Sequence, residues 1–131
     1  MKNTSKKRDP IKWVRDRAKS AYTKKSSCEI CGTTEDLELH HYHSLTLLFE
    51  QFAKLKNYDI STDESVCLIR DEFIETYHQE LYELTVTLCN FHHVKLHTVY
   101  GTKPAANTVQ KQQRWVGIQK EKHESKILAG I

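Results

Sequence analysis

The spacing of apolar residues changes several times along the chain, and each change indicates a different element. Apolar residues recur every three or four positions over residues 10–24 and 44–57, which predicts two amphipathic helices. Apolar and polar residues alternate over residues 37–43, and residues 84–88 form a short β-prone run, so two strands are expected. We therefore expect an α+β fold that is mainly helical.

The two predicted strands are separated by a long helical segment. Ser61 to Glu64 form a capping-box pattern, and the apolar stripe from Val66 to Tyr77 continues behind it as a second helix. Together with the helix over 44–57, this predicts an acidic helical hairpin, residues 44–82, inserted between the strands.

The end of the chain carries two further helical signals. Residues 90–100 precede Gly101, which we expect to act as a left-handed cap that ends a helix. After Pro104, Asn107 can cap a last helix that reaches about His123. Helices are thus expected both before the first strand and after the second strand in the sequence.

Length and composition indicate one small domain, residues 1–131, with residues 1–9 as a disordered basic tail. A chain of this length buries only a small hydrophobic core unless a cross-link such as a bound metal ion stabilises it. The first residues contain no apolar run that resembles a signal peptide, and no segment approaches the length of a membrane span. We therefore expect a soluble, thiol-reduced protein of the cytoplasm.

Charge is distributed unevenly along the chain, although the net charge is only +3. Residues 1–25 carry ten Lys/Arg and two acidic residues, residues 26–94 carry three and thirteen, and residues 95–131 carry seven and two. Two basic ends around an acidic middle suit a polyanionic partner such as nucleic acid. The alternative is that lysine-rich ends only keep the protein in solution.

Candidate chemistry is concentrated in two windows, residues 37–44 and 88–101, which hold six of the eight histidines. Histidine is a common metal ligand and a general base near neutral pH. Strand alternation places His40 and His41 on opposite faces, whereas His93 and His97 share one helix face. This pattern indicates a metal-centred site.

Cysteines accompany both windows. Cys28 and Cys31 form a Cys-x-x-Cys knuckle before the first window, and Cys89 begins the second. Thiolates at this spacing are typical of structural zinc sites, although ordinary buried cysteines are the alternative. Cys67 is a competing ligand, but its apolar neighbours predict a free cysteine of the core.

Taken together, these motifs resemble the HNH endonucleases, whose fold is the ββα-metal finger. The resemblance covers residues 28–43 and 84–97 closely, and the small size and basic ends look like stand-alone phage HNH proteins. It implies a zinc knuckle whose structural Zn²⁺ is held by Cys28, Cys31, Cys89 and His92. It also implies a catalytic divalent cation held by His40, His93 and His97, with His41 as the general base.

One position departs from the family pattern. The family usually has an Asn five residues before the cysteine at Cys89, where it orients the general base, and this chain has Leu84. A backbone carbonyl can serve the same purpose, and Glu83 and Thr85 are the candidates if the register shifts.

The resemblance implies hydrolysis of DNA phosphodiester bonds, as nicking or double-strand cleavage, in the cytoplasm of a phage-infected bacterium. Family usage favours Mg²⁺ as the catalytic cation, whereas a histidine-rich ligand set favours a transition metal. Double-stranded DNA is the expected partner. The sequence does not decide whether the protein forms a homodimer or whether the acidic insertion binds a protein partner. Expected nucleic-acid contacts are Lys12, Arg15, Arg17, Lys19, Lys111 and Arg114.

Two alternative functions fit parts of the sequence. A non-catalytic, zinc-stabilised module that binds nucleic acid or protein would explain the cysteines and His92, but it leaves four histidines without a role. An RNase with the same site would use the same chemistry on RNA.

Overall fold

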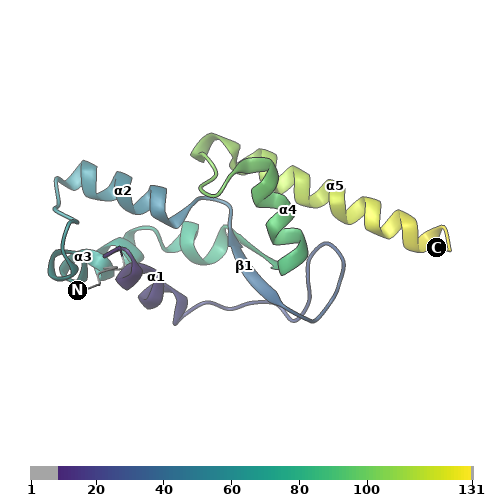
Figure 1. Cartoon of the computed structure of the whole chain (residues 1–131), viewed down its shortest axis with the longest axis horizontal. Helices are drawn as coiled ribbons and strands as arrows, with labels where there is room; N and C mark the ends of the chain where they lie inside the picture. Colours follow the sequence, from purple (N-terminus) through teal and green to yellow (C-terminus); the bar gives the residue numbers. More distant parts are fainter. Residues whose placement is uncertain (1–8, 131) are drawn as a thin grey trace, which may run out of the picture.

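A two-stranded antiparallel sheet lies between two groups of helices in the computed structural model, which describes residues 9–130 (Figure 1). Strand β1 (Leu37–His41) pairs with β2 (Thr85–Cys89), and Leu39 lies opposite Thr87. The mainly helical α+β prediction is confirmed. Residues 1–8, which make up most of the predicted tail, lie outside the described residues.

The segment between the strands is helical, as expected. It contains α2 (Leu45–Lys56), α3 (Asp63–Thr76) and the short π-helix η1 (Gln79–Glu83). The predicted capping box at Ser61 was wrong by one position, because the Ser61 hydroxyl donates to Asp59 instead. The box is formed by Thr62 and Ser65, whose side chains each bind the other residue's backbone N–H.

The N-terminal helix α1 (Lys12–Lys19) packs against α3 and completes the core of the insertion. Its predicted apolar stripe is buried at Val14 and Ala18, where it meets Phe49 and Phe73 in one hydrophobic cluster. The helix was expected to reach residue 24 but ends at Lys19, because the chain turns there through Ala21 N–H to the Ala18 carbonyl. The insertion is therefore not an independent hairpin, since α1 covers it.

Helix α4 (Asn90–Tyr100) follows β2 without a loop and has the predicted bounds. Gly101 ends it with a positive φ of 91°, which favours glycine, but its ψ of 170° lies outside the left-handed helical region expected for the cap. After the 3-10 turn η2 (Ala106–Thr108), α5 (Val109–Leu128) continues five residues past the predicted end and extends away from the body (Figure 1).

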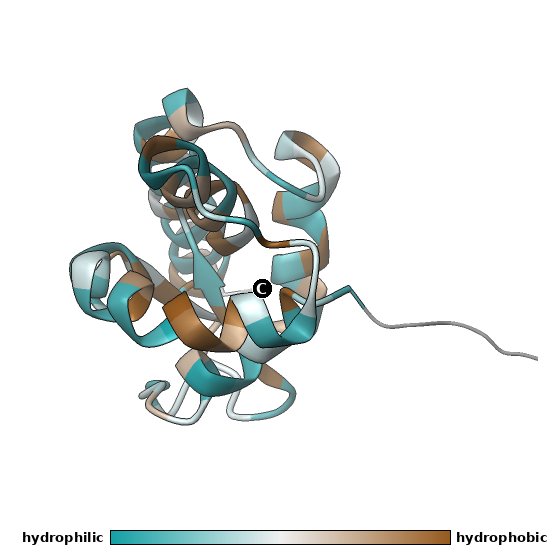
Figure 2. Cartoon of the chain, turned by 90° about the vertical axis from the view of Figure 1, so that its left-hand side faces the viewer, coloured by the Kyte–Doolittle hydropathy of each residue, from teal (hydrophilic) through white to brown (hydrophobic). Residues whose placement is uncertain are grey.

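A second hydrophobic cluster lies on the other side of the molecule. It joins Ile30 of the knuckle, Leu88 of β2, Leu96 of α4 and Val116 of α5. Figure 2 shows the amphipathic character of the helices as brown and teal segments that alternate along them. None of the helices among residues 9–130 is both long and apolar enough to cross a membrane.

Candidate metal centres and general base

The knuckle that carries Cys28 and Cys31 is fixed to β2. The Gly32 N–H donates to the Cys28 carbonyl at 2.9 Å, and Gly32 has a φ of 75° that favours glycine. The Glu29 N–H donates to the carbonyl of Thr87 at 2.9 Å. These bonds hold the knuckle against the strand that leads into α4.

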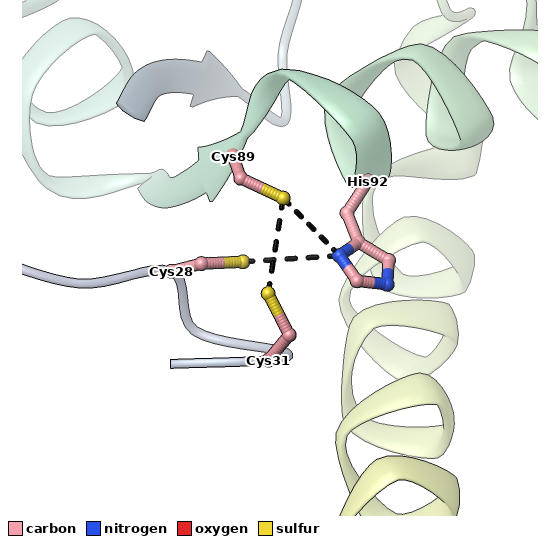
Figure 3. A group of neighbouring side chains, drawn as sticks. All are labelled: Cys28, Cys31, Cys89 and His92. Atoms are coloured by element: carbon pink, nitrogen blue, oxygen red, sulfur yellow. Dashed lines mark hydrogen bonds between the residues drawn. The ribbon is translucent and has the colours of Figure 1, made fainter. Parts of the chain in front are cut away.

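Four side chains point towards a common centre at the junction of the knuckle, β2 and α4 (Figure 3). The Cys31 and Cys89 sulfurs lie 3.9 Å apart, and His92 Nδ1 lies 4.0 Å from Cys28 Sγ and 3.3 Å from Cys89 Sγ. Tetrahedral Zn²⁺ with ordinary bond lengths sets sulfurs about 3.8 Å apart and sulfur and nitrogen about 3.6 Å apart. The three thiols and the imidazole therefore fit a zinc ion.

Cys67 does not compete for this site. It is exposed on α3, so the expectation that it belongs to the core was wrong. Its apolar neighbours in the sequence were misleading, because Leu68 is also exposed, at 83%.

A second group brings together His40 of β1 and two histidines of α4. His93 Nε2 lies 3.1 Å from His40 Nδ1 and 3.0 Å from His97 Nε2. His40 points from β1 towards α4. The i, i+4 spacing places His93 and His97 on the side of α4 that faces His40.

The other nitrogen of each ring is held by an oxygen acceptor. His93 Nδ1 lies 2.7 Å from Glu38 Oε1, and His97 Nδ1 lies 2.7 Å from the Gly101 carbonyl. His40 Nε2 lies 2.8 Å from Gln112 Oε1. A neutral imidazole has a single N–H, and each ring uses it on its acceptor, so three unprotonated nitrogens converge with no proton between them. A cation fits this arrangement, and oxygen acceptors behind the ligands are typical of metal sites.

Gln112 is a functional candidate that the sequence analysis missed. It is fully buried, and its Nε2 donates at 3.0 Å to both the Tyr42 carbonyl and Thr108 Oγ1. These two acceptors fix the amide so that its oxygen faces His40. The only signal in the sequence was the place of Gln112 on the inner stripe of the last helix.

Burial favours the neutral form of two of these histidines. It lowers the pKa of His40 to about 3, and burial also lowers the pKa of His93, although the carboxylate of Glu38 opposes this. Near pH 7 both rings therefore offer a lone pair without losing a proton first.

His41 lies on the opposite face of β1, as its alternation with His40 predicted. Its Nε2 donates to the Leu81 carbonyl at 2.9 Å, which leaves Nδ1 as the acceptor. Its ring is 4.9 Å from that of Tyr22, and burial lowers the pKa of His41. A cleft of about 160 Å³ is lined by His41 and by all three histidines of the second group.

The carbonyl that orients His41 does not come from the expected positions. The Leu84 carbonyl accepts from Tyr42 N–H just beyond the paired strands, and the acceptor for His41 lies three residues earlier, at Leu81. Leu81 is in the π-helix η1, near its end, where carbonyls are left without helical partners. The sequence gave no sign of this π-helix.

The predicted nucleic-acid contacts occupy different environments. Arg17 Nε lies 3.3 Å from Asp71 of α3, and Arg15 Nη2 lies 3.3 Å from Thr46 Oγ1. The ammonium of Lys12 lies over the Trp13 ring. Lys19 borders a groove that His93 also lines. Exposed positions on α5 include Lys111 and Arg114.

The Gln112 contact gives a testable prediction. Replacing Gln112 with Met keeps the side-chain length but removes the acceptor for His40, so we expect cation affinity at the three histidines to fall about 10- to 100-fold. Calorimetric titration of Mn²⁺ into the zinc-loaded protein measures it. Val116→Ala removes buried volume one turn further along α5 and serves as the matched control. Equal affinity in the Met variant and the wild type would contradict a positioning role.

Comparison with known proteins identifies a family. The phage T5 nicking endonuclease model, described as the nicking endonuclease family, matches residues 1–128. No solved structure matches the chain. Because the match spans both cysteine and histidine groups and nearly all of the 131 residues, the chain belongs to the nicking endonuclease family.

Proposed function

We propose that this protein, a member of a phage family of DNA nucleases, hydrolyses DNA phosphodiester bonds by the HNH mechanism and nicks one strand. The observation that carries the proposal is a cleft lined by three histidines whose ring nitrogens converge and by a fourth histidine, His41, that is not part of that group. A base beside a cation site is what hydrolysis of a phosphodiester requires.

In this proposal His41 is the general base. Its Nε2 proton is held by the Leu81 carbonyl, so Nδ1 takes the proton of the attacking water. The lowered pKa of His41 keeps the ring in the basic form near neutral pH. The Leu81 carbonyl also restricts rotation of the His41 ring. In the HNH family an Asn at the position of Leu84 usually orients the general base.

The residues that hold the catalytic cation are His40, His93 and His97. When bound there, a divalent cation supplies positive charge beside the scissile phosphate and the leaving oxygen. Glu38 and Gln112 orient two of these rings before substrate binds. Three imidazole ligands favour a transition metal, and Mn²⁺ and Mg²⁺ are the ions to compare.

The structural Zn²⁺ of the proposal joins the knuckle to the first turn of α4. Cys89 ends β2, and His92 lies three residues later on the helix, so the metal would fix where α4 begins. The same helix carries His93 and His97. The zinc site thereby supports the placement of the catalytic ligands.

Supercoiled plasmid tests the proposal. Incubation with Mg²⁺, Mn²⁺, Ni²⁺, Co²⁺ or Zn²⁺ should convert it to the open circular form with at least one of the ions, and EDTA should abolish the reaction. Single-stranded RNA of matched length serves as the substrate control. Absence of open circles with every ion would refute the proposal, and faster cleavage of the RNA would assign the site to an RNase.

A further inference from the structure

The end of α1 and the segment that follows it form one wall of a groove of about 550 Å³ that leads to the proposed catalytic centre. The wall carries Lys19, Tyr22 and Lys24. The opposite side is formed by Leu37, Glu38 and Leu39 of β1, whose one strand partner within residues 9–130 is β2. His93, a ligand of the proposed catalytic cation, also lines the groove.

Charge distinguishes this groove from its neighbours. Two other cavities border the same segment, and one of them, lined by Ala21, Ile74 and Tyr82, has no lysine or arginine in its lining. The other is lined by Lys25, but Glu29 and Glu83 line it as well, and Lys25 Nζ is 3.9 Å from Glu29. The phosphates of a nucleic-acid strand would find no cation in the first cavity and would be repelled by the carboxylates of the second.

The two lysines of the groove remain available for an anionic ligand. Within the part of the chain that the structure describes, neither Lys19 nor Lys24 is in an ion pair, whereas Arg17 is paired with Asp71. Lys24 Nζ donates to the Leu37 carbonyl at 3.0 Å, which holds the ammonium at the groove and leaves two N–H donors.

The lining of the groove contains one carboxylate, Glu38, and two lysines, so its net charge stays positive. Glu38 accepts from Asn90 Nδ2 at 3.1 Å and from His93 Nδ1 at 2.7 Å. Tyr22 lies between the groove and the general base, since it lines the groove and its ring is 4.9 Å from that of His41. Cations beside an aromatic ring are typical of grooves that follow a single nucleic-acid strand.

We propose that this groove binds the segment of the cleaved DNA strand next to the scissile phosphate, with Lys19 and Lys24 on its phosphates and Tyr22 against a sugar or base. The inference rests on the proposed nuclease function. It assigns binding of the DNA strand to the end of α1 and the segment that follows it. It also makes Lys24 a DNA contact, which the sequence analysis did not predict.

Salt dependence of binding tests the groove. We would compare Lys19→Gln/Lys24→Gln with Lys54→Gln/Lys126→Gln, each in a His41→Ala background that prevents cleavage. The second pair removes the same charge from exposed positions on α2 and distal α5. Fluorescence anisotropy with a labelled duplex would be recorded from 50 to 300 mM NaCl.

Loss of two phosphate contacts should lower the slope of log affinity against log salt by about 1.8, and affinity at 0.1 M salt should fall by about tenfold or more. The control pair should change the slope by less than about 0.5. Equal slopes for the two pairs, with a wild type that still nicks plasmid, would overturn the groove assignment alone. Failure of the wild type to bind or to nick DNA would overturn the nuclease proposal, and the groove proposal with it.

Discussion

Replacing His41 with alanine will lower the rate of plasmid nicking by about 100- to 10,000-fold, because general-base catalysis contributes about that much. The ring is held by the Leu81 carbonyl, and burial lowers its pKa, so the wild type has a neutral, oriented base near pH 7. The variant keeps His40 and the two histidines of α4. Its cation content and its affinity for DNA should therefore stay close to those of the wild type.

The matched control is His78→Ala. His78 is exposed, and its Nδ1 lies 3.9 Å from the carboxylate of Glu83. This variant should nick at close to the wild-type rate. Single-turnover rates with saturating cation separate the chemical step from binding, and circular dichroism checks that both variants fold. Equal single-turnover rates for His41→Ala and the wild type would remove His41 from the mechanism.

Local periodicity predicted how individual histidines are placed on their own strand or helix. Alternation along a strand separated His40 from His41, and the i, i+4 spacing brought His93 and His97 to one face of α4. Both inferences needed only the geometry of a single element. The grouping of these histidines depended on the family resemblance, and the structure brings the same three together.

The missed residues depend on contacts between distant segments. Gln112 lies 72 residues after the histidine that it holds, and a buried Gln has the same sequence signature as a solvated one. Leu81 contributes only a backbone carbonyl, so its side chain gives no indication of the contact. The π-helix η1 that carries this carbonyl contacts α1 through the Tyr82 hydroxyl, which donates to the Ala18 carbonyl. Apart from the place of Gln112 on the inner stripe of the last helix, residue spacing indicates none of these contacts.

Replacing Cys89 with alanine will remove the structural zinc and destabilise the protein by several kcal/mol. Structural zinc sites in small domains contribute about 10–16 kcal/mol of apparent binding free energy, and one ligand of four is lost. Cys89 is the last residue of β2 and immediately precedes α4, so loss of the metal frees the knuckle from the start of that helix. Thermal unfolding and metal analysis by mass spectrometry would measure both effects.

The chain provides its own control for this prediction. Cys67→Ala makes the same chemical change at an exposed thiol on α3, and it should leave the zinc content at one ion per chain and the melting temperature almost unchanged. Because α4 carries both His92 and two of the proposed catalytic ligands, Cys89→Ala should also lower nicking, even though Cys89 does not line the cleft. A Cys89 variant that retains its zinc, or that melts at the same temperature as the Cys67 variant, would show that the four-residue site does not hold the fold together.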